Sequence, residues 1–171
     1  MDPDQSDRAG MRATAVNADL LAGVLLGKGV PAAVMTRGDL GGELWNTERA
    51  CDLLAGGTVV VLAGGMGKPG MSSDYPAVFH AAEIGASAVL VAKHGVDAVF
   101  TDDPHTSPCA TRLEKVTCSE AIDAGLGFMD RSALEAARDE TITLFVFSSD
   151  SRGAGLRAIA RGEAGTVVLP Q

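Results

Sequence analysis

The sequence predicts an α/β protein whose mainly parallel sheet is covered by helices on both faces. Short apolar runs alternate along the 171 residues with longer segments in which apolar residues recur at helical spacing. The apolar runs are continuous rather than alternating, which is typical of strands buried on both sides. Such strands alternating with helices indicate parallel strand–helix–strand units. The length and the 46% hydrophobic content predict a single domain over residues 1–171, with residues 1–10 flexible.

In the first half of the chain, two helices alternate with two strands. These four elements are expected at residues 11–26, 31–35, 46–54 and 58–62. Gly27 and Gly29 end the first helix, and Asn46 or Thr47 caps the second. The second strand is an uninterrupted run of threonine, valine and leucine, so we expect a central strand covered on both faces.

The second half continues the alternation. Helices are expected at residues 74–83, 119–124, 130–138 and 153–161, and strands at 88–92, 143–147 and 166–169. Residues 93–117 are less regular and contain a turn before Pro104.

The charge balance narrows the classes of partner. There are 14 basic and 22 acidic side chains, which give a formal net charge of -8 and a sequence pI near 4.7. Nucleic acid and anionic membrane surfaces both attract basic patches, so neither is expected as a partner. No apolar stretch approaches the roughly 20 residues that span a bilayer. The acidic, polar start is unlike a secretory signal, and we expect a cytoplasmic protein.

The three cysteines, Cys51, Cys109 and Cys118, are widely spaced and odd in number. No pair has the spacing of a zinc site, and no histidine stands at ligand distance along the sequence. We therefore expect reduced thiols and no metal site.

A glycine-rich loop at residues 64–73 is the strongest local signal for a ligand. Gly64, Gly65 and Gly67 follow a predicted strand and precede a predicted helix. Glycines there let backbone N–H groups approach an anion at the helix N-terminus. Pro69 removes one donor, and no Walker Gly-Lys-Ser/Thr follows. Phosphate binding and a plain strand-to-helix turn both remain open.

Polar residues end the loop and begin the predicted helix that follows. Ser72, Ser73 and Asp74 are typical helix-capping residues, and on the pattern alone capping is favoured. Their functional interpretation has the hydroxyls donating to a phosphate and Asp74 near a transferred group or a metal.

Charged residues also stand near the ends of later strands. Lys93 and His94 end an apolar strand, where a lysine can neutralise phosphate or simply be solvated. Asp102 and Asp103 form a turn and leave room for nucleotide contacts. The sequence shows neither a Ser-His-Asp order nor a pair of carboxylates of the kind that hydrolases use.

The order of these pieces resembles the bacterial UMP kinases of the amino acid kinase superfamily. The matching segments are residues 61–69, 72–74, 81–86, 89–93, 96–100, 103–104, 130–133 and 165–168. A weaker match upstream resembles the family's Asp-x-x-Gly-Met helix start, with Asp7 as its aspartate and Thr14 shortly after it. So many short matches in one order are far more specific than the glycine loop alone.

The resemblance implies a nucleotide-binding fold. Its acceptor UMP would be held by the glycine loop and the hydroxyls after it, while the motif's aspartate contacts the nucleoside. By position these roles fall to Asp7, Gly64, Gly65, Gly67, Ser72 and Ser73. The ATP side would use the region of Lys93, Phe100, Asp103 and Pro104. Mg²⁺ and ATP are implied only if kinase activity survives, and family members form dimers and hexamers.

Departures from the family point to weak catalysis. The sequence begins after the family's first strand and its lysine-and-glycine segment, which hold the transferring phosphates. Phosphoryl transfer depends on positioning and charge neutralisation, so we expect little or no kinase activity. Gly70 and Met71 replace an aromatic pair beside the acceptor, Gly95 stands as a one-residue insertion, and Ser148 replaces an asparagine.

Three functions stay open from the sequence. The first is a UMP-kinase-like protein that binds a nucleotide or another small anionic ligand but transfers phosphate poorly. The second is a biosynthetic enzyme recruited to a new substrate, using Lys93, His94 or Asp74. The third is a non-catalytic interaction protein that uses the helix at 11–26 to assemble with itself, as a dimer or hexamer, or with a full-length kinase.

Overall fold

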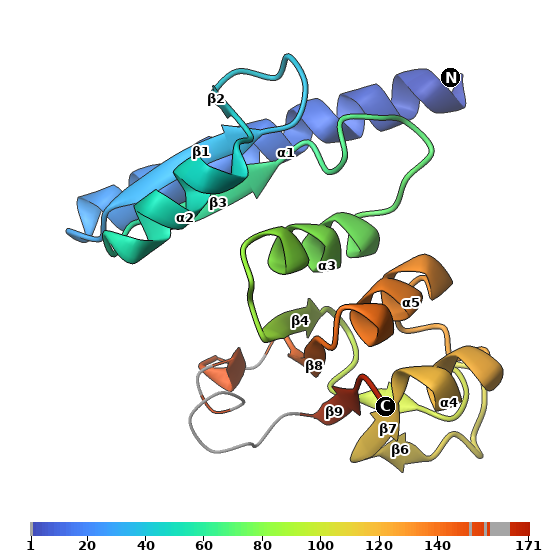
Figure 1. Cartoon of the computed structure of the whole chain (residues 1–171). Helices are drawn as coiled ribbons and strands as arrows, with labels where there is room; N and C mark the ends of the chain where they lie inside the picture. Colours follow the sequence, from blue (N-terminus) through green and yellow to red (C-terminus); the bar gives the residue numbers. More distant parts are fainter. Residues whose placement is uncertain (1, 151, 156, 158–164) are drawn as a thin grey trace. The chain divides into compact units, whose positions relative to one another are not determined.

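The computed structural model describes residues 2–150, 152–155, 157 and 165–171 (Figure 1). It contains two compact units, Met1–Pro76 and Ala77–Gln171, and each is described by itself. The mixed arrangement of helices and mainly parallel strands confirms the predicted fold class. Whether residues 1–171 form the single domain that we expected from their length stays a prediction.

The first unit is a small parallel sheet between two helices. Its elements are α1 (Pro3–Gly27), β1 (Ala32–Thr36), β2 (Glu43–Leu44), α2 (Thr47–Ala55) and β3 (Val59–Ala63). The strand order is β2-β1-β3, with both pairings parallel. Helix α1 runs along one face of the sheet and α2 lies on the other (Figure 1).

Small side chains form the contact between α1 and the sheet. Ala15, Ala18 and Ala22 recur at helical spacing, are buried, and cluster with Val61 and Ala63 of β3. Alanine faces let a helix approach a strand closely, which brings the side chains of α1 near the end of β3. This close contact positions the glycine loop that follows β3.

The helix ends partly follow expectation. Asn46 caps α2, as predicted, and its side chain accepts a hydrogen bond from the Arg49 amide at 2.8 Å. The expected start of the first helix at residue 11 was wrong, because α1 begins at Pro3 and includes residues that we expected to be flexible. Proline is favoured in the first helical turn, and Asp4 there complements the helix dipole.

Strand β3 does not occupy the central position that its apolar sequence predicted. Within the described residues it pairs with β1 alone and ends the three-stranded sheet. Val59 and Leu62 are each 40% exposed. The expectation of a central strand was therefore wrong, although α1 and α2 both contact β3, since apolar composition reports side-chain preference and not the number of paired neighbours.

The second unit contains a four-stranded mixed sheet. Its elements are β4 (Ala88–Lys93), β5 (Val99–Phe100), β6 (Arg112–Leu113), β7 (Lys115–Thr117), α4 (Cys118–Asp123), α5 (Arg131–Asp139), β8 (Thr143–Ser148) and β9 (Thr166–Leu169). The order is β4-β8-β9-β7, in which only the β8–β9 pairing is antiparallel, and β5 and β6 pair separately. Helix α3 (Asp74–Glu83) has the predicted bounds and spans the division between the units.

The core of the second unit lies where α5 and the central strands meet. Leu134, Ile142, Leu144 and Val146 are almost fully buried. Thr166 is also buried, and its hydroxyl accepts a hydrogen bond from the Val99 amide and donates one to a carbonyl of β6. This threonine therefore fixes the small β5–β6 pair to the main sheet.

Other expectations have mixed outcomes. The helix expected at residues 153–161 falls largely outside the described residues, whereas the last strand has its predicted bounds. The short strands β2, β5, β6 and β7 were not predicted.

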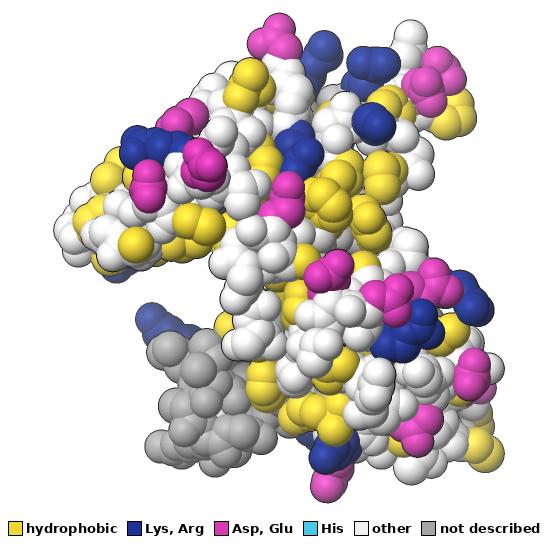
Figure 2. Space-filling view, viewed as in Figure 1, with side chains coloured by type: hydrophobic (Ala, Val, Ile, Leu, Met, Phe, Trp, Pro, Cys, Tyr) yellow, Lys and Arg dark blue, Asp and Glu magenta, His cyan; other side chains and the backbone are white. Residues whose placement is uncertain are grey.

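Among the described helices, none has the length and apolar character needed to cross a membrane. On the face shown in Figure 2, acidic and basic side chains are interspersed.

Candidate functional site

The loop between β3 and α3 has the backbone that its glycines allow. Gly64, Gly65, Gly67 and Gly70 have φ angles of 82°, 55°, 72° and 76°. Residues with a Cβ rarely adopt this left-handed region. The glycines are therefore required by the path of the chain, as the sequence suggested.

Packing gives two of these glycines a structural reason as well. A Cβ on Gly64 would lie 2.9 Å from the carbonyl oxygen of Arg37 and would collide with Leu40. A Cβ on Gly67 would lie 3.3 Å from the same carbonyl oxygen. The loop is thus packed closely on the segment that follows β1.

Two side chains of α1 hold the loop. The hydroxyl of Thr14 accepts a hydrogen bond from the Gly64 amide at 2.9 Å and donates one to the carbonyl of Met11 at 2.6 Å. The carboxylate of Asp7 accepts a hydrogen bond from the Gly70 amide at 2.6 Å. Asp7 and Thr14 are seven positions apart, which places them on the same face of the helix.

Asp7 therefore lies at the glycine loop, as its proposed ligand role requires. Thr14 was part of the quoted motif but was not assigned to the site. Helical spacing from Asp7 was the signal in the sequence that could have identified it.

The loop amides divide into engaged and available donors. The Gly64 and Gly70 amides bind α1, and the Gly67 amide donates to the Gly64 carbonyl at 2.9 Å. For the amides of Gly65 and Met66, the described part of the chain offers no hydrogen-bond acceptor. An anion at this loop would therefore be held by Gly65 and Met66, while Gly64 and Gly67 shape the loop.

The residues after the loop show the capping arrangement. The Ser72 hydroxyl accepts a hydrogen bond from the Asp74 amide at 3.2 Å. Ser73 is exposed, and Asp74 is the half-buried first residue of α3. An aspartate at a helix N-terminus is favourable to the helix dipole but repels an anionic ligand. Both serine hydroxyls remain within the segment where a phosphate could bind.

Lys93 and His94 lie at the carboxyl end of β4, in the second unit. The Lys93 carbonyl accepts hydrogen bonds from Ser149, from its amide at 2.7 Å and from its hydroxyl at 3.0 Å. Asp150 binds His94 through Nδ1 at 2.6 Å and accepts the Gly95 amide at 2.9 Å. The hydrogen bond from the Gly95 amide lowers the pKa of Asp150 most, and the hydrogen bond with His94 lowers it further.

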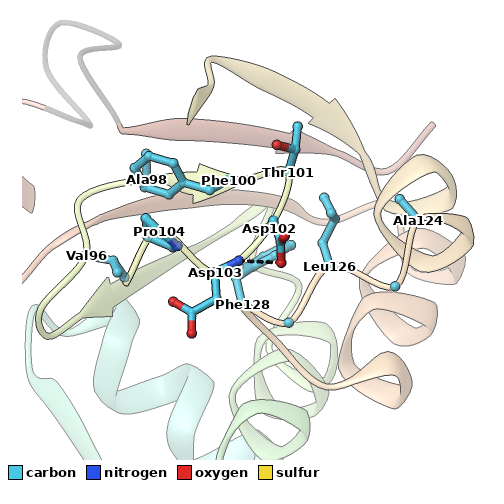
Figure 3. A pocket seen from close by; sticks show the side chains of 12 residues that line it. Val96, Ala98, Phe100, Thr101, Asp102, Asp103, Pro104, Ala124, Leu126 and Phe128 are labelled. Carbon is cyan, nitrogen blue, oxygen red and sulfur yellow. Dashed lines mark hydrogen bonds between the residues drawn. The ribbon is translucent and has the colours of Figure 1, made fainter. Parts of the chain in front are cut away.

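A cavity of about 500 Å³ lies beside this edge and is shown in Figure 3. Phe100 and Phe128 give it two aromatic side chains, and Asp102 and Asp103 give it two carboxylates. Asp102 accepts a hydrogen bond from the Asp103 amide at 2.8 Å, the dashed line in Figure 3. Asp103 in turn accepts the His105 amide at 2.9 Å.

A second cavity of about 340 Å³ shares part of this wall. Both cavities are lined by Val96, Phe100 and Pro104, and the second adds Asp97, Asp150 and His105 among others. The described residues that line either cavity include four aspartates but neither lysine nor arginine. The Asp97 carboxylate is 3.1 Å from Arg112, which partly compensates its charge.

The predicted site residues thus form two groups. Asp7, the glycines and the two serines belong to the first unit, and Phe100 and Asp103 line a cavity of the second. Asp74 belongs to the first unit and Lys93 to the second, so each is described only among its own neighbours. No set of three or more histidine, cysteine or acidic side chains that could hold a metal occurs in the part of the chain that the structure describes.

Known proteins resemble this chain over most of its length. The sequence profile of the Amino acid kinase family matches residues 1–148. A uridylate kinase of Frankia alni is 42% identical, over 98% of this chain and 67% of that protein. One from Streptococcus thermophilus is 38% identical, over 98% and 69%.

Solved structures give the same result. The UMP kinase of Bacillus anthracis superposes with a TM-score of 0.93 at 35% identity, covering all of this chain and 71% of that one. The UMP kinase of Ureaplasma parvum gives 0.90 at 29% identity, covering 99% and 73%. The chain spans about two thirds of the length of the curated relatives that it matches. It belongs to the amino acid kinase family and resembles, within that family, the UMP (uridylate) kinases.

Proposed function

We propose that this chain binds a nucleotide or another small phosphate-bearing ligand and that it transfers phosphoryl groups poorly. The observation that carries the proposal is the glycine loop, whose left-handed backbone is fixed by Thr14 and Asp7 of α1. A preorganised loop with unengaged amides binds an anion without the cost of ordering its backbone.

The names of the relatives indicate which ligand this loop would bind. Proteins 42% and 38% identical to this chain are named uridylate kinases, and UMP is the acceptor in that reaction by name. The Gly65 and Met66 amides and the Ser72 and Ser73 hydroxyls supply donors to a phosphate. The second carboxylate oxygen of Asp7 supplies an acceptor for a sugar hydroxyl. UMP is therefore the first ligand to test.

The larger cavity suits the nucleoside part of a second ligand. Phe100 and Phe128 offer aromatic surface to a base, and Asp103 offers a carboxylate to ribose hydroxyls. ATP is the candidate here, because the resemblance assigns this region to the ATP side.

The charges argue against efficient transfer. Phosphoryl transfer requires cations or metal ions that neutralise charge as it develops on the transferred group. The two cavities are lined by aspartates, and their described lining contains neither lysine nor arginine. Lys93 stands nearby at the end of β4 but does not line either cavity.

A direct test measures phosphate transfer from ATP to UMP by the purified chain with Mg²⁺. We expect UMP binding without appreciable turnover. Strong turnover that Asp74→Asn abolishes, while Asp4→Asn leaves it intact, would contradict the second half of the proposal. Asp4 is a suitable control because it is an acidic residue in the first turn of α1, distant in sequence from the loop.

An interaction function is a second candidate, because α1 exposes an apolar stripe. Val16, Leu20 and Val24 recur every four residues and are 60%, 65% and 56% exposed. Such a stripe on one helix face is typical of a protein interface. Self-association through it is tested by light scattering at micromolar concentration with Leu20→Glu as the disrupting variant. A monomer in both forms would reject this candidate.

A further inference from the structure

An arginine stands beside the glycine loop at the carboxyl edge of the sheet in the first unit. The last residue of β1 is paired with the last residues of β2 and β3, so the three strands end at the same level. The residues that follow are Arg37 after β1, Trp45 after β2 and Gly64 after β3. Because β1 is the central strand, Arg37 lies between the tryptophan and the glycine loop.

Arg37 packs directly on the loop. A Cβ on Gly64 would lie 2.9 Å from the Arg37 carbonyl oxygen, and a Cβ on Gly67 would lie 3.3 Å from the Arg37 Cβ. Between these two glycines stand Gly65 and Met66, whose amides are the available donors of the loop. Arg37 therefore contacts the loop on both sides of the segment that we propose to hold a phosphate.

Trp45 limits the positions that the arginine side chain can take. The guanidinium carbon of Arg37 lies 6.0 Å from the centre of the Trp45 ring, within the range of a cation–π interaction. The Trp45 amide donates a hydrogen bond to the Thr36 carbonyl at 2.9 Å, which fixes the backbone that carries the ring. Both side chains are half-buried, and Nε of Arg37 is buried. A charge partly withdrawn from water interacts more strongly with an anion.

An anion at the loop requires a compensating positive charge, because two carboxylates adjoin the loop. Asp7 binds the amide of Gly70, and Asp74 begins α3. Lys68 lies within the loop, but its side chain is exposed and its charge is screened by water. Arg37 is the cation that packing holds at the loop.

We infer that Arg37, oriented by Trp45, binds the phosphate of the ligand at the glycine loop and makes this site select phosphate monoesters over the free nucleoside. A guanidinium presents paired N–H donors that match two phosphate oxygens, and its charge is permanent. The inference rests on the proposed phosphate binding at the loop and adds to it the residue that neutralises the ligand.

The test is calorimetric titration of the full chain with UMP and with uridine, followed by displacement of UMP with inorganic phosphate. Uridine carries the nucleoside alone, and inorganic phosphate carries the anion alone. Arg37→Gln removes the charge, and Arg37→Lys keeps the charge without the paired donors. Lys68→Gln tests the other cation of the loop. Arg49→Gln on α2 is the matched control, because Arg49 is 51% exposed and is paired with Glu43 at 3.2 Å.

We expect Arg37→Gln to weaken UMP binding roughly tenfold and Arg37→Lys roughly threefold. The inhibition constant of inorganic phosphate should rise by the same factors. Uridine affinity should not change, and Arg49→Gln should match the unmodified chain. Urea unfolding of each variant reports whether it is folded, and if Arg37→Gln does not fold, the selective loss in Arg37→Lys decides.

Three results would overturn the inference. The first is an unchanged UMP affinity in Arg37→Gln, and the second is a loss in Lys68→Gln but not in Arg37→Gln. The third is an equal loss for UMP and uridine, which would mean that Arg37 only supports the packing of the loop. If uridine binds too weakly to titrate, an unchanged inhibition constant of inorganic phosphate in Arg37→Gln has the same meaning.

Trp45→Leu tests the orienting role. It removes the aromatic face, and we expect UMP affinity to fall severalfold while uridine affinity stays the same. An unchanged UMP affinity, or equal losses for both ligands, would contradict that role. If neither UMP nor inorganic phosphate binds the unmodified chain, the proposed function fails together with the inference. If UMP binds and Arg37→Gln leaves its affinity unaltered, the inference alone fails.

Discussion

The Thr14 hydroxyl accepts a hydrogen bond from the Gly64 amide at 2.9 Å, across fifty positions of sequence. This bond fastens the first residue of the glycine loop to α1 at the point where β3 ends. Because the buried alanines of α1 already pack on β3, the hydroxyl reaches the loop from a fixed support. The loop is therefore positioned by a helix that stands far from it in the sequence.

Replacing Thr14 by valine keeps the shape and branching of the side chain and removes the hydrogen bond. The Gly64 amide then loses its acceptor, and we expect the free energy of unfolding to fall by about 1 kcal/mol. UMP affinity should fall as well, because the loop loses one attachment. Urea unfolding and calorimetry measure the two effects. Thr14→Ser, which keeps the hydroxyl, is the control, and equal losses in both variants would exclude the hydrogen bond as the cause.

Gly64→Ala and Gly70→Ala separate packing from backbone strain. Both glycines have positive φ angles, but only a Cβ on Gly64 meets neighbouring atoms within 4 Å. We expect Gly70→Ala to cost about 1 kcal/mol, from φ alone, and Gly64→Ala about 3 kcal/mol, because it also collides with Leu40. Thermal or urea unfolding measures the difference. Equal destabilisation would show that the segment after β1 yields easily.

Asp7→Ala should release the Gly70 end of the loop. The Asp7 carboxylate accepts the Gly70 amide at 2.6 Å, and a charged acceptor gives a strong hydrogen bond. We expect hydrogen exchange of the Gly70 amide to accelerate about tenfold in the variant. Asp4→Ala, in the same helix, should leave that amide unchanged. Unaltered exchange in Asp7→Ala would contradict the attachment.

The hydrogen bonds of Asp150 with His94 and with the Gly95 amide predict that the free energy of unfolding depends on pH. The Gly95 amide and His94 lower the pKa of Asp150 in the folded chain. The unfolded chain therefore binds this proton first, near pH 4, and the stabilising contribution is present above that pH. It is lost as the pH falls through the lower, folded pKa. Asp150→Asn should thus lose less stability than the unmodified chain on acidification.

Urea unfolding between about pH 5 and about pH 3 measures this difference. Glu120 also has a lowered pKa, chiefly from its hydrogen bond with the Thr117 amide, and contributes in the same range. Because Glu120 is present in both proteins, the comparison with Asp150→Asn isolates the contribution of Asp150 to the pH dependence. Parallel curves for the two proteins would contradict a contribution from Asp150.

The sequence was most informative where structure is local. Helix α3 has its predicted bounds, because capping residues and helical spacing mark both ends. The Asn46 cap of α2 was predicted for the same reason. The glycine loop, too, could be located from its composition and its position between a strand and a helix.

Relationships between distant residues could not be predicted in this way. The edge position of β3 depends on which strands pair, and its apolar sequence resembles that of a central strand. The pair of His94 and Asp150 spans 56 positions and forms only because β4 and β8 are parallel neighbours. For Thr14 the helical spacing from Asp7 was the one signal in the sequence, and its hydrogen bond with Gly64, fifty positions away, could not be predicted from local pattern.

Calorimetric titration of the purified chain with UMP, with UTP and ATP as comparators, tests the proposed ligand site most directly. We expect selective UMP binding that weakens in Thr14→Val, because the hydrogen bond that supports the loop would also support the ligand site. Absence of binding by all three nucleotides would contradict the proposal and leave the glycine loop as a structural turn between β3 and α3.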